Sequence, residues 1–197
     1  RAMPARVRPD ESNGRLILAN IYDGRNMTGL QRGEIKKLLV LETLPMPIHF
    51  TGGMEPLSYG GTFTLERILG TIPVEPDGSV YAEVPALRSL FFVALDENDL
   101  SVKRMQSFST VMPGETQGCV GCHEHRAQTP LTSFQNTLAV RKAPAPIEPI
   151  RDVPALFDFP RDIQPVLNAL CVDCHGYDKT ARGGPRAGKL ILTGDHG

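Results

Sequence analysis

Two short segments of the sequence share an arrangement of residues that can hold a metal-containing group. They are residues 119–123 (CVGCH) and residues 171–175 (CVDCH), and together they contain all four cysteines of the chain. Cysteines three residues apart occupy neighbouring positions on a helical turn, so both sulfurs can reach the same edge of a flat ligand. The histidine that follows then presents an imidazole next to that ligand.

This spacing is typical of haem c attachment, in which two thioether bonds hold the porphyrin and the histidine binds its iron. We therefore expect two covalently bound haem c groups, with His123 on the first iron and His175 on the second. The expected haem-binding residues are Cys119, Cys122 and His123 for the first group, and Cys171, Cys174 and His175 for the second.

Two other interpretations use the same cysteines. Four cysteines in two CxxC pairs can hold one structural zinc ion, which would make this a zinc-stapled β-domain with no redox role. A CxxC pair can also be a redox dithiol or a disulfide. Neither requires a histidine after the second cysteine, and the chain has only five histidines. The repeated histidine therefore favours haem.

The sixth ligand of each iron decides what the haem can do. Histidine or methionine at that position gives a low-spin electron carrier, whereas an open position admits small ligands. The run 101–112 alternates, so Met105 within it is predicted to pack in the core. The candidate sixth ligands are His125, His196, His49, Met54 and Met112.

Composition and charge describe an ordinary globular chain. Of its 197 residues, 41% are hydrophobic and 22% are charged, and the 21 basic residues nearly balance the 22 acidic ones. A net charge of −1 gives no reason to expect nucleic acid as a partner. No stretch approaches eighteen apolar residues, so we expect no membrane span. Partners must follow from the two cysteine motifs, which predict an external redox partner protein.

The N-terminus at Arg1 has no apolar segment of the kind that a secretory signal requires. Haem c is attached on the outer side of the bacterial cytoplasmic membrane, so we expect a periplasmic or other exported location. We therefore expect the chain to be part of a longer exported polypeptide or a complex.

The first half of the chain has the pattern of a β-structure. Short segments that mix β-branched, apolar and polar residues are separated by Gly or Pro clusters, which favours strands over helices. The segments are 15–22, 34–42, 62–69, 70–74, 79–84, 90–95 and 101–112. Their spacing of about ten residues predicts an antiparallel β-sandwich.

The sequence after residue 112 predicts the elements on which the two cysteine motifs lie. Residues 113–118 read as a turn, followed by a short helix over 119–128, while five prolines between 143 and 160 predict an extended connector. Apolar residues at 163, 166, 167 and 170 predict a helix leading into the second motif. We therefore expect a β-sandwich with the first motif over 1–140, a linker over 141–160 and a small α-helical cytochrome c-like domain over 161–197.

A family resemblance extends these expectations. Residues 70–108 and 112–126, which include the first motif, resemble the middle domain of the hydrazine synthase alpha subunit family, and residues 163–176 resemble its C-terminal haem-bearing part. The resemblance implies a β-sandwich with one haem c, then a helical domain with another. In that family a tyrosine four residues after the motif histidine holds the catalytic iron, and the histidine binds zinc. Ala127 stands at that position here, so hydrazine synthesis is not carried over.

Together these patterns predict a di-haem c-type cytochrome domain for electron transfer. The alternative is a catalytic haem enzyme of nitrogen or peroxide metabolism, similar to hydrazine synthase, with one five-coordinate iron. The sixth ligands separate the two functions.

Overall fold

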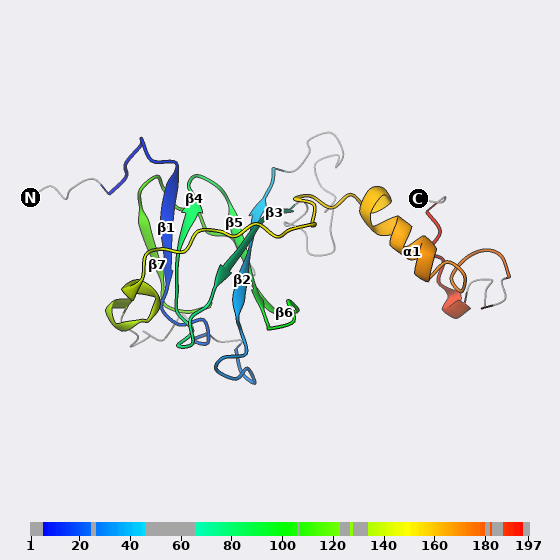
Figure 1. The fold of residues 1–197 in the computed structure, drawn as a ribbon, viewed down its shortest axis with the longest axis horizontal. Helices are drawn as coiled ribbons and strands as arrows, with labels where there is room; N and C mark the ends of the chain where they lie inside the picture. The colour runs from blue at the N-terminus through cyan, green and yellow to red at the C-terminus, as the bar shows by residue number, and fades with distance from the viewer. Residues whose placement is uncertain are drawn as a thin grey trace, which may run out of the picture. The chain divides into compact units, whose positions relative to one another are not determined.

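The computed structural model describes residues 6–24, 27–45, 66–105, 107–122, 127, 134–179, 182 and 187–194. The chain forms two compact units, residues 1–153 and residues 154–197. Within the described residues, the first unit contains seven β-strands and the second contains one short α-helix (Figure 1).

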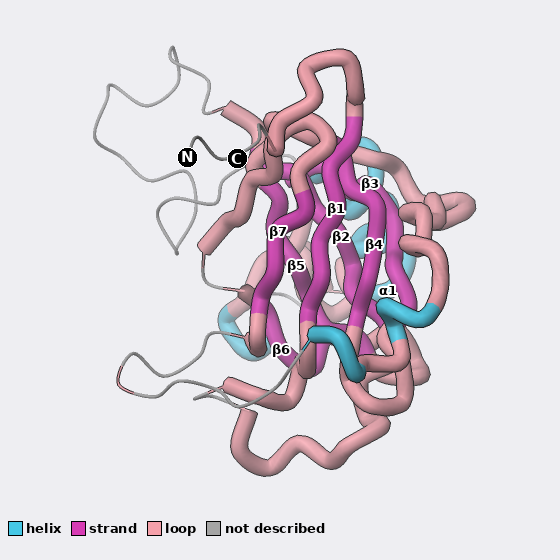
Figure 2. Tube along the Cα trace, turned by 90° about the vertical axis from the view of Figure 1, so that its left-hand side faces the viewer, coloured by secondary structure: helices cyan, strands magenta, loops and turns pink. Residues whose placement is uncertain are grey.

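The strands of the first unit form two sheets. One sheet has the order β4-β1-β7 and the other β3-β2-β5-β6, and Figure 2 shows them as two layers. The strands are β1 (Asn13–Leu18), β2 (Lys37–Thr43), β3 (Glu66–Pro73), β4 (Val80–Pro85), β5 (Leu90–Leu95), β6 (Ser101–Arg104) and β7 (Thr116–Cys119). A mainly β architecture with antiparallel pairing is therefore confirmed, with one exception: β1 and β7 run parallel.

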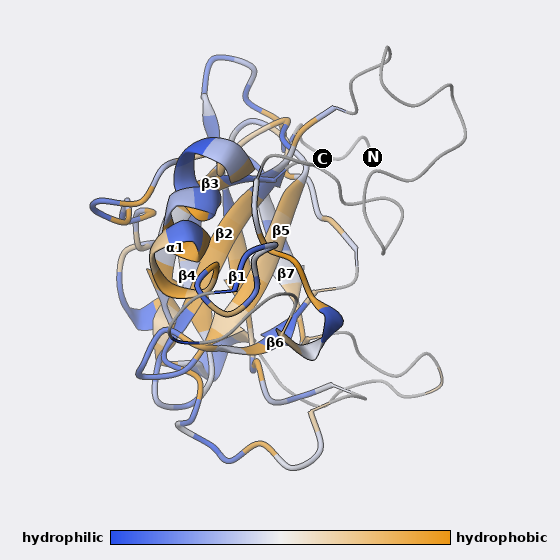
Figure 3. Ribbon diagram, turned by 90° about the vertical axis from the view of Figure 1, so that its right-hand side faces the viewer, coloured by the Kyte–Doolittle hydropathy of each residue, from blue (hydrophilic) through white to orange (hydrophobic). Residues whose placement is uncertain are grey.

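Alternation along the strands creates the core between the sheets. In β1, every second residue is buried, and Leu16 and Leu18 point to the same side. They share one apolar cluster with side chains from the facing sheet, such as Leu38 and Val40 of β2. Figure 3 shows the apolar residues concentrated on the strands. The pattern of alternating residues therefore supplies the apolar surface that joins the two layers.

Strand β5 is buried on both of its faces. Leu90 and Ala94 belong to the core between the sheets, whereas Phe91, Val93 and Leu95 belong to a second cluster on the other face. This explains the continuous apolar run of residues 90–95, for which the predicted strand bounds are confirmed.

The proline-rich segment packs partly against the sandwich. Ala145 exchanges backbone hydrogen bonds with β4, and Glu148 exchanges two with Thr71 of β3. Ile147 packs against the core between these contacts. The segment therefore joins the edges of the two sheets along the β4/β3 side, where Figure 1 shows it in yellow. The sequence predicts only an extended connector here. Its prolines give no sign that Ala145 and Glu148 pair with strand edges, because that pairing depends on the distant strands β4 and β3.

Of the turn predicted over residues 113–118, the structure has a turn at Pro113 and Gly114, and strand β7 replaces the rest from Thr116. Its residues 116–119 (TQGC) have no apolar alternation, and they form a strand because β1 offers a free edge that they can pair with. The helix predicted to begin at Cys119 is also wrong in its first turn, since Cys119 ends β7 and residues 120–122 bend without helical structure.

The second unit has little regular structure. Helix α1 (Gln164–Leu170) follows a π-helical turn (Phe159–Ile163), and it runs directly into the second motif as predicted. A 3₁₀ turn (Ala187–Lys189) follows later. Within the described residues, the helical domain predicted over 161–197 thus contains one short α-helix. In the part of the chain that the structure describes, no helix has the length and apolarity to cross a membrane.

A hydrogen-bond network around Asp77 holds residues 138–139, which follow the first motif in the chain, against the turn before β4. One carboxylate oxygen of Asp77 accepts hydrogen bonds from the amide and hydroxyl of Ser79, at 3.0 and 2.6 Å. The other accepts the Leu138 amide at 2.8 Å, and the Ser79 hydroxyl accepts the Ala139 amide at 3.0 Å. Burial raises the pKa of Asp77, but these hydrogen bonds together outweigh it, so its pKa lies below the ordinary value.

We predict that Asp77→Asn lowers the free energy of unfolding at pH 7 by about 1–3 kcal/mol, because an amide cannot accept all three bonds. The stabilisation by the Asp77 carboxylate is complete above about pH 4, the ordinary carboxyl pKa in the unfolded chain. It is lost as the pH falls through the lower pKa of the folded state. Urea unfolding at several pH values measures both effects.

The matched control is Asp10→Asn, which changes an exposed aspartate in a turn. Its unfolding curve should match that of the unchanged protein at every pH. An equal loss of stability in the two variants would contradict the role of the Asp77 network.

Candidate functional site

A cavity of about 490 Å³ lies between the two sheets, and the first cysteine pair lines it. Its volume falls within the range of small-molecule and cofactor sites. Most of its wall is apolar, and its lining residues come from strands β1, β2, β5, β6 and β7 and from the segments that follow β1, β6 and β7. The side chains that contribute to this wall are Leu16, Leu18, Ile21, Leu38, Phe92 and Ala94.

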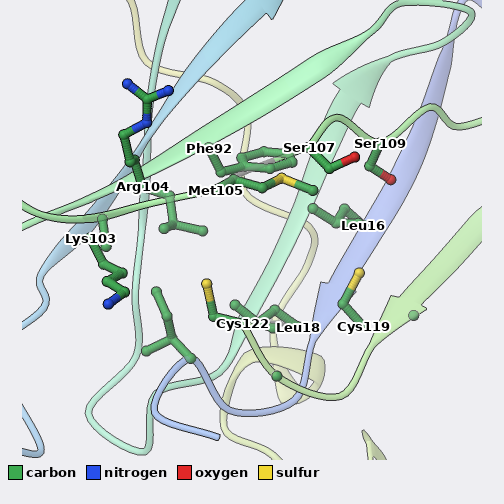
Figure 4. Close-up of a pocket in the computed structure, with 15 residues that line it drawn as sticks. Leu16, Leu18, Phe92, Lys103, Arg104, Met105, Ser107, Ser109, Cys119 and Cys122 are labelled. Carbon is green, nitrogen blue, oxygen red and sulfur yellow. The ribbon is translucent and has the colours of Figure 1, made fainter. Parts of the chain in front are cut away.

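The sulfurs of Cys119 and Cys122 both point into this cavity (Figure 4). Both side chains are partly buried and pack against the main core. Phe92 and Met105 occupy the opposite wall (Figure 4). Two partly buried thiols therefore share one wall of an apolar cavity.

Backbone pairing with β1 holds the first motif in place. Cys119 lies beside Leu18 in the parallel β1–β7 ladder. The ladder continues beyond the strands, because the amides of Ala19 and Asn20 donate to the carbonyls of Cys119 and Val120, at 2.9 and 3.0 Å. The central strand of the first sheet thus determines where the first thiol lies.

Two glycines allow the motif to lie directly against the turn after β1. A Cβ atom on Gly121 would collide with the carbonyl oxygen of Asp23, and one on Gly24 would collide with the carbonyl oxygen of Cys122. Both obstacles are backbone atoms, which cannot move aside as a flexible side chain can. Gly121 is therefore needed at this position of the motif, a requirement that the sequence analysis did not identify.

Two basic residues of β6, Lys103 and Arg104, line the cavity, and Arg104 also lies over the Phe91 ring. Lys103 lies opposite Ala94 in the β5–β6 ladder, and cross-strand partners point to the same face of a sheet. Among the residues that the structure describes, Lys103 has no ion-pair partner. An ammonium group beside an apolar cavity favours an anion there. Apolar walls, two thiols and basic side chains fit a porphyrin, which is apolar but carries carboxylates.

The second cysteine pair lies on a tight turn that continues α1. The amides of Cys174 and His175 both donate to the carbonyl of Cys171, at 3.1 and 2.9 Å. The Cys171 amide in turn donates to Leu167 of the helix at 2.8 Å. The turn brings the two cysteines and the histidine to neighbouring positions, as the spacing predicts.

His175 is held in one orientation by the chain that follows. Its Nδ1 atom lies 2.8 Å from the carbonyl oxygen of Ala187. A carbonyl oxygen only accepts hydrogen bonds, so Nδ1 carries the proton and the neutral ring keeps a lone pair on Nε2. A carbonyl partner of this kind fixes the tautomer and orientation of metal-binding histidines. The Leu192 amide also donates to the His175 carbonyl, at 2.8 Å.

The described residues of the second unit form no apolar core. Among its described residues only Gly176 is buried, and α1 contains no buried side chain. Val166, Leu170 and Leu190 are 52%, 77% and 48% exposed. Units of this size usually need a metal, a cofactor or disulfides to fold stably. A large apolar group next to His175 fits this composition.

Among the sixth ligands that the sequence proposes, the structure describes only Met112. Met112 is 41% exposed and does not line the cavity. Met105, predicted to be a core residue, does line it. Five sequence candidates lie outside the described residues, and these are His123, His125, His49, His196 and Met54.

The geometry also bears on the other uses of cysteine. All four cysteines lie among the described residues, and none forms a disulfide. Across the described ranges, no group of three or more His, Cys, Asp or Glu side chains is placed to hold a metal ion. The two cysteine pairs also lie in different units, with Cys119 and Cys122 in the first and Cys171 and Cys174 in the second.

We predict that Gly121→Ala destabilises the first unit by about 1–3 kcal/mol, because the added methyl group must displace the backbone at Asp23. The displaced motif should also carry less of the haem c that the sequence predicts at Cys119 and Cys122. Urea unfolding measures the first effect, and mass spectrometry of the peptide that contains residues 119–123 measures the second.

Asp173→Ala is the matched control, since Asp173 occupies the equivalent position of the second motif. Its side chain is 57% exposed and forms an ion pair of 3.7 Å with Arg182. Exposed pairs contribute little, so stability and attachment at residues 171–175 should hardly change. Wild-type behaviour of Gly121→Ala would overturn the steric argument.

Comparisons with known proteins agree with this architecture. Residues 33–124 match the family model described as the hydrazine synthase alpha subunit middle domain. The match contains strands β2 to β7 and extends through the first motif. No curated protein matched the chain.

A solved structure, Kuenenia stuttgartiensis hydrazine synthase, is similar in fold. The TM-score is 0.66 at 19% sequence identity, and the similarity covers 89% of this chain. The chain spans only 30% of the length of its counterpart in that structure. Its sandwich is thus similar in sequence to the middle domain of the hydrazine synthase alpha subunit, and most of the chain is similar in fold to hydrazine synthase.

Proposed function

We propose that this protein is a di-haem c-type cytochrome domain that transfers electrons. Cys119 and Cys122 would tether the first haem in the sandwich cavity, and His123 would ligate its iron. The second haem would use Cys171 and Cys174, with His175 on the iron. The bound haems would supply the redox chemistry, while the chain orients and insulates them.

The orientation of His175 is the observation that carries this proposal. Its Nδ1 proton is donated to Ala187, so Nε2 is the atom available to a metal. The two cysteine positions precede it on the same turn, and the exposed Leu170 comes directly before that turn. A disulfide or dithiol role for the cysteines gives no reason for this histidine geometry.

Electron transfer requires a donor or an acceptor, so we also propose an external redox partner protein. Attachment through thioethers takes place outside the bacterial cytoplasmic membrane, which supports a periplasmic or other exported location. The chain corresponds to less than a third of the similar solved chain, and this supports a role within a longer polypeptide or a complex.

The similarity to hydrazine synthase supports a second candidate function. One iron could remain five-coordinate in the 490 Å³ cavity and act on a small nitrogen compound or a peroxide, with the other haem as electron feeder. Ala127 stands where the resemblance places a tyrosine, so this candidate is a haem enzyme of other chemistry.

We predict two haems per chain when the protein is produced in a bacterial host that matures cytochromes c. A pyridine haemochrome spectrum should give a haem-to-protein ratio near two, and the intact mass should exceed that of the polypeptide by two haems. Cys119→Ala/Cys122→Ala and Cys171→Ala/Cys174→Ala should each remove one haem. A colourless protein with the bare polypeptide mass would refute the proposal.

The ligation state separates the two candidate functions. For an electron carrier we predict low-spin spectra from both haems and no carbon monoxide binding after reduction, because both axial positions of each iron are filled. A high-spin component that binds one equivalent of carbon monoxide would instead support the catalytic alternative.

A further inference from the structure

We propose that Met105 supplies the sixth ligand to the iron of the haem tethered at Cys119 and Cys122. This inference rests on the proposed haem attachment and adds the identity of a ligand that sequence analysis assigned to the core. It would make the first iron six-coordinate and therefore an electron carrier.

Sheet topology puts the cysteines and Met105 on facing edges of the sandwich. Strand β7 is the last strand of one sheet and β6 is the last strand of the other. Cys119 ends β7, and Met105 comes directly after β6. The cavity lies between these edges, and both residues line it.

The backbone holds Met105 at the cavity wall. Its amide donates to the carbonyl of Phe92 at 2.9 Å, which extends the β5–β6 pairing by one residue. Figure 4 shows the Met105 side chain beside the Phe92 ring, across the cavity from the two cysteine sulfurs. A thioether on that wall would be available to the iron of a haem held at Cys119 and Cys122.

The other described methionines are placed differently. Met27 is 6% exposed and belongs to the packed core, while Met112 is 41% exposed, and neither lines the cavity. Met105 is thus the one thioether among the described cavity-lining residues. Its side chain also packs partly against the cluster around Phe91, which gives the competing interpretation of a packing residue.

The second unit makes the spectroscopic test specific. Residues 154–197 contain no methionine, so the second haem cannot obtain a thioether ligand from its own unit. In the oxidised protein, bonding between methionine sulfur and iron gives a weak far-red charge-transfer band. In the reduced protein, the porphyrin ring current shifts the methyl resonance of the bound methionine strongly upfield.

The experiment compares the full-length, haem-loaded protein with Met105→Leu and the control Met112→Leu. Leucine keeps the volume of methionine but cannot bind iron, so the fold should be retained. Met105→Leu should lose the far-red band and the upfield methyl resonance, lower the reduction potential of one haem and gain one equivalent of carbon monoxide binding. Met112→Leu should keep all four properties of the unchanged protein.

A second variant, Met105→His, tests ligation independently of packing. It should restore a low-spin six-coordinate iron that binds no carbon monoxide, with a lower potential and without the far-red band, because imidazole raises the potential less than a thioether does. The inference is overturned if Met105→Leu leaves the band and the potential unchanged, or if the unchanged protein lacks the band.

The outcomes distinguish this inference from the proposed function. Peptide mass spectrometry first establishes whether residues 119–123 carry a haem. Absence of haem there refutes the proposed function, whereas a haem with unaltered spectra in Met105→Leu refutes only the ligand assignment.

Discussion

The parallel pairing of β7 with β1 is the interaction on which the first site depends. β1 is the central strand of its sheet and pairs with β4 on its other side. Its ladder to β7 extends through the carbonyl of Val120, so the first cysteine pair is positioned by backbone hydrogen bonds. A site built on a strand is more precise than one on a loop, because the sheet fixes the backbone.

The two sides of the sandwich end differently. At the β4/β3 side, residues 145–148 pair with both strand edges, and Ile147 fills the space between them. At the β7/β6 side, a cavity takes the place of such a segment. Among the described residues, the core is thus closed by backbone pairing on one side and lined by a cavity on the other.

The two cysteine motifs lie in different local structures. In the first, a strand end and two close glycine contacts direct Cys119 and Cys122 into a cavity that the sandwich has already formed. In the second, a helical turn gathers Cys171, Cys174 and His175, and the chain near Ala187 returns to hold the imidazole. The first cysteine pair is thus partly buried among core residues, whereas described apolar residues of the second unit, such as Leu170 and Leu190, are exposed.

The sequence by itself determined the cysteine motifs, the mainly β character of the first unit, strand β5 and the helix before Cys171. These follow from local spacing and periodicity, which are properties of neighbouring residues. Only the tertiary structure decided that residues 116–119 form a strand, that Gly121 lies against Asp23, and that Met105 rather than Met112 lines the cavity. Those outcomes depend on contacts between residues far apart in the chain, and no local pattern of amino acids encodes which free strand edge a segment will meet.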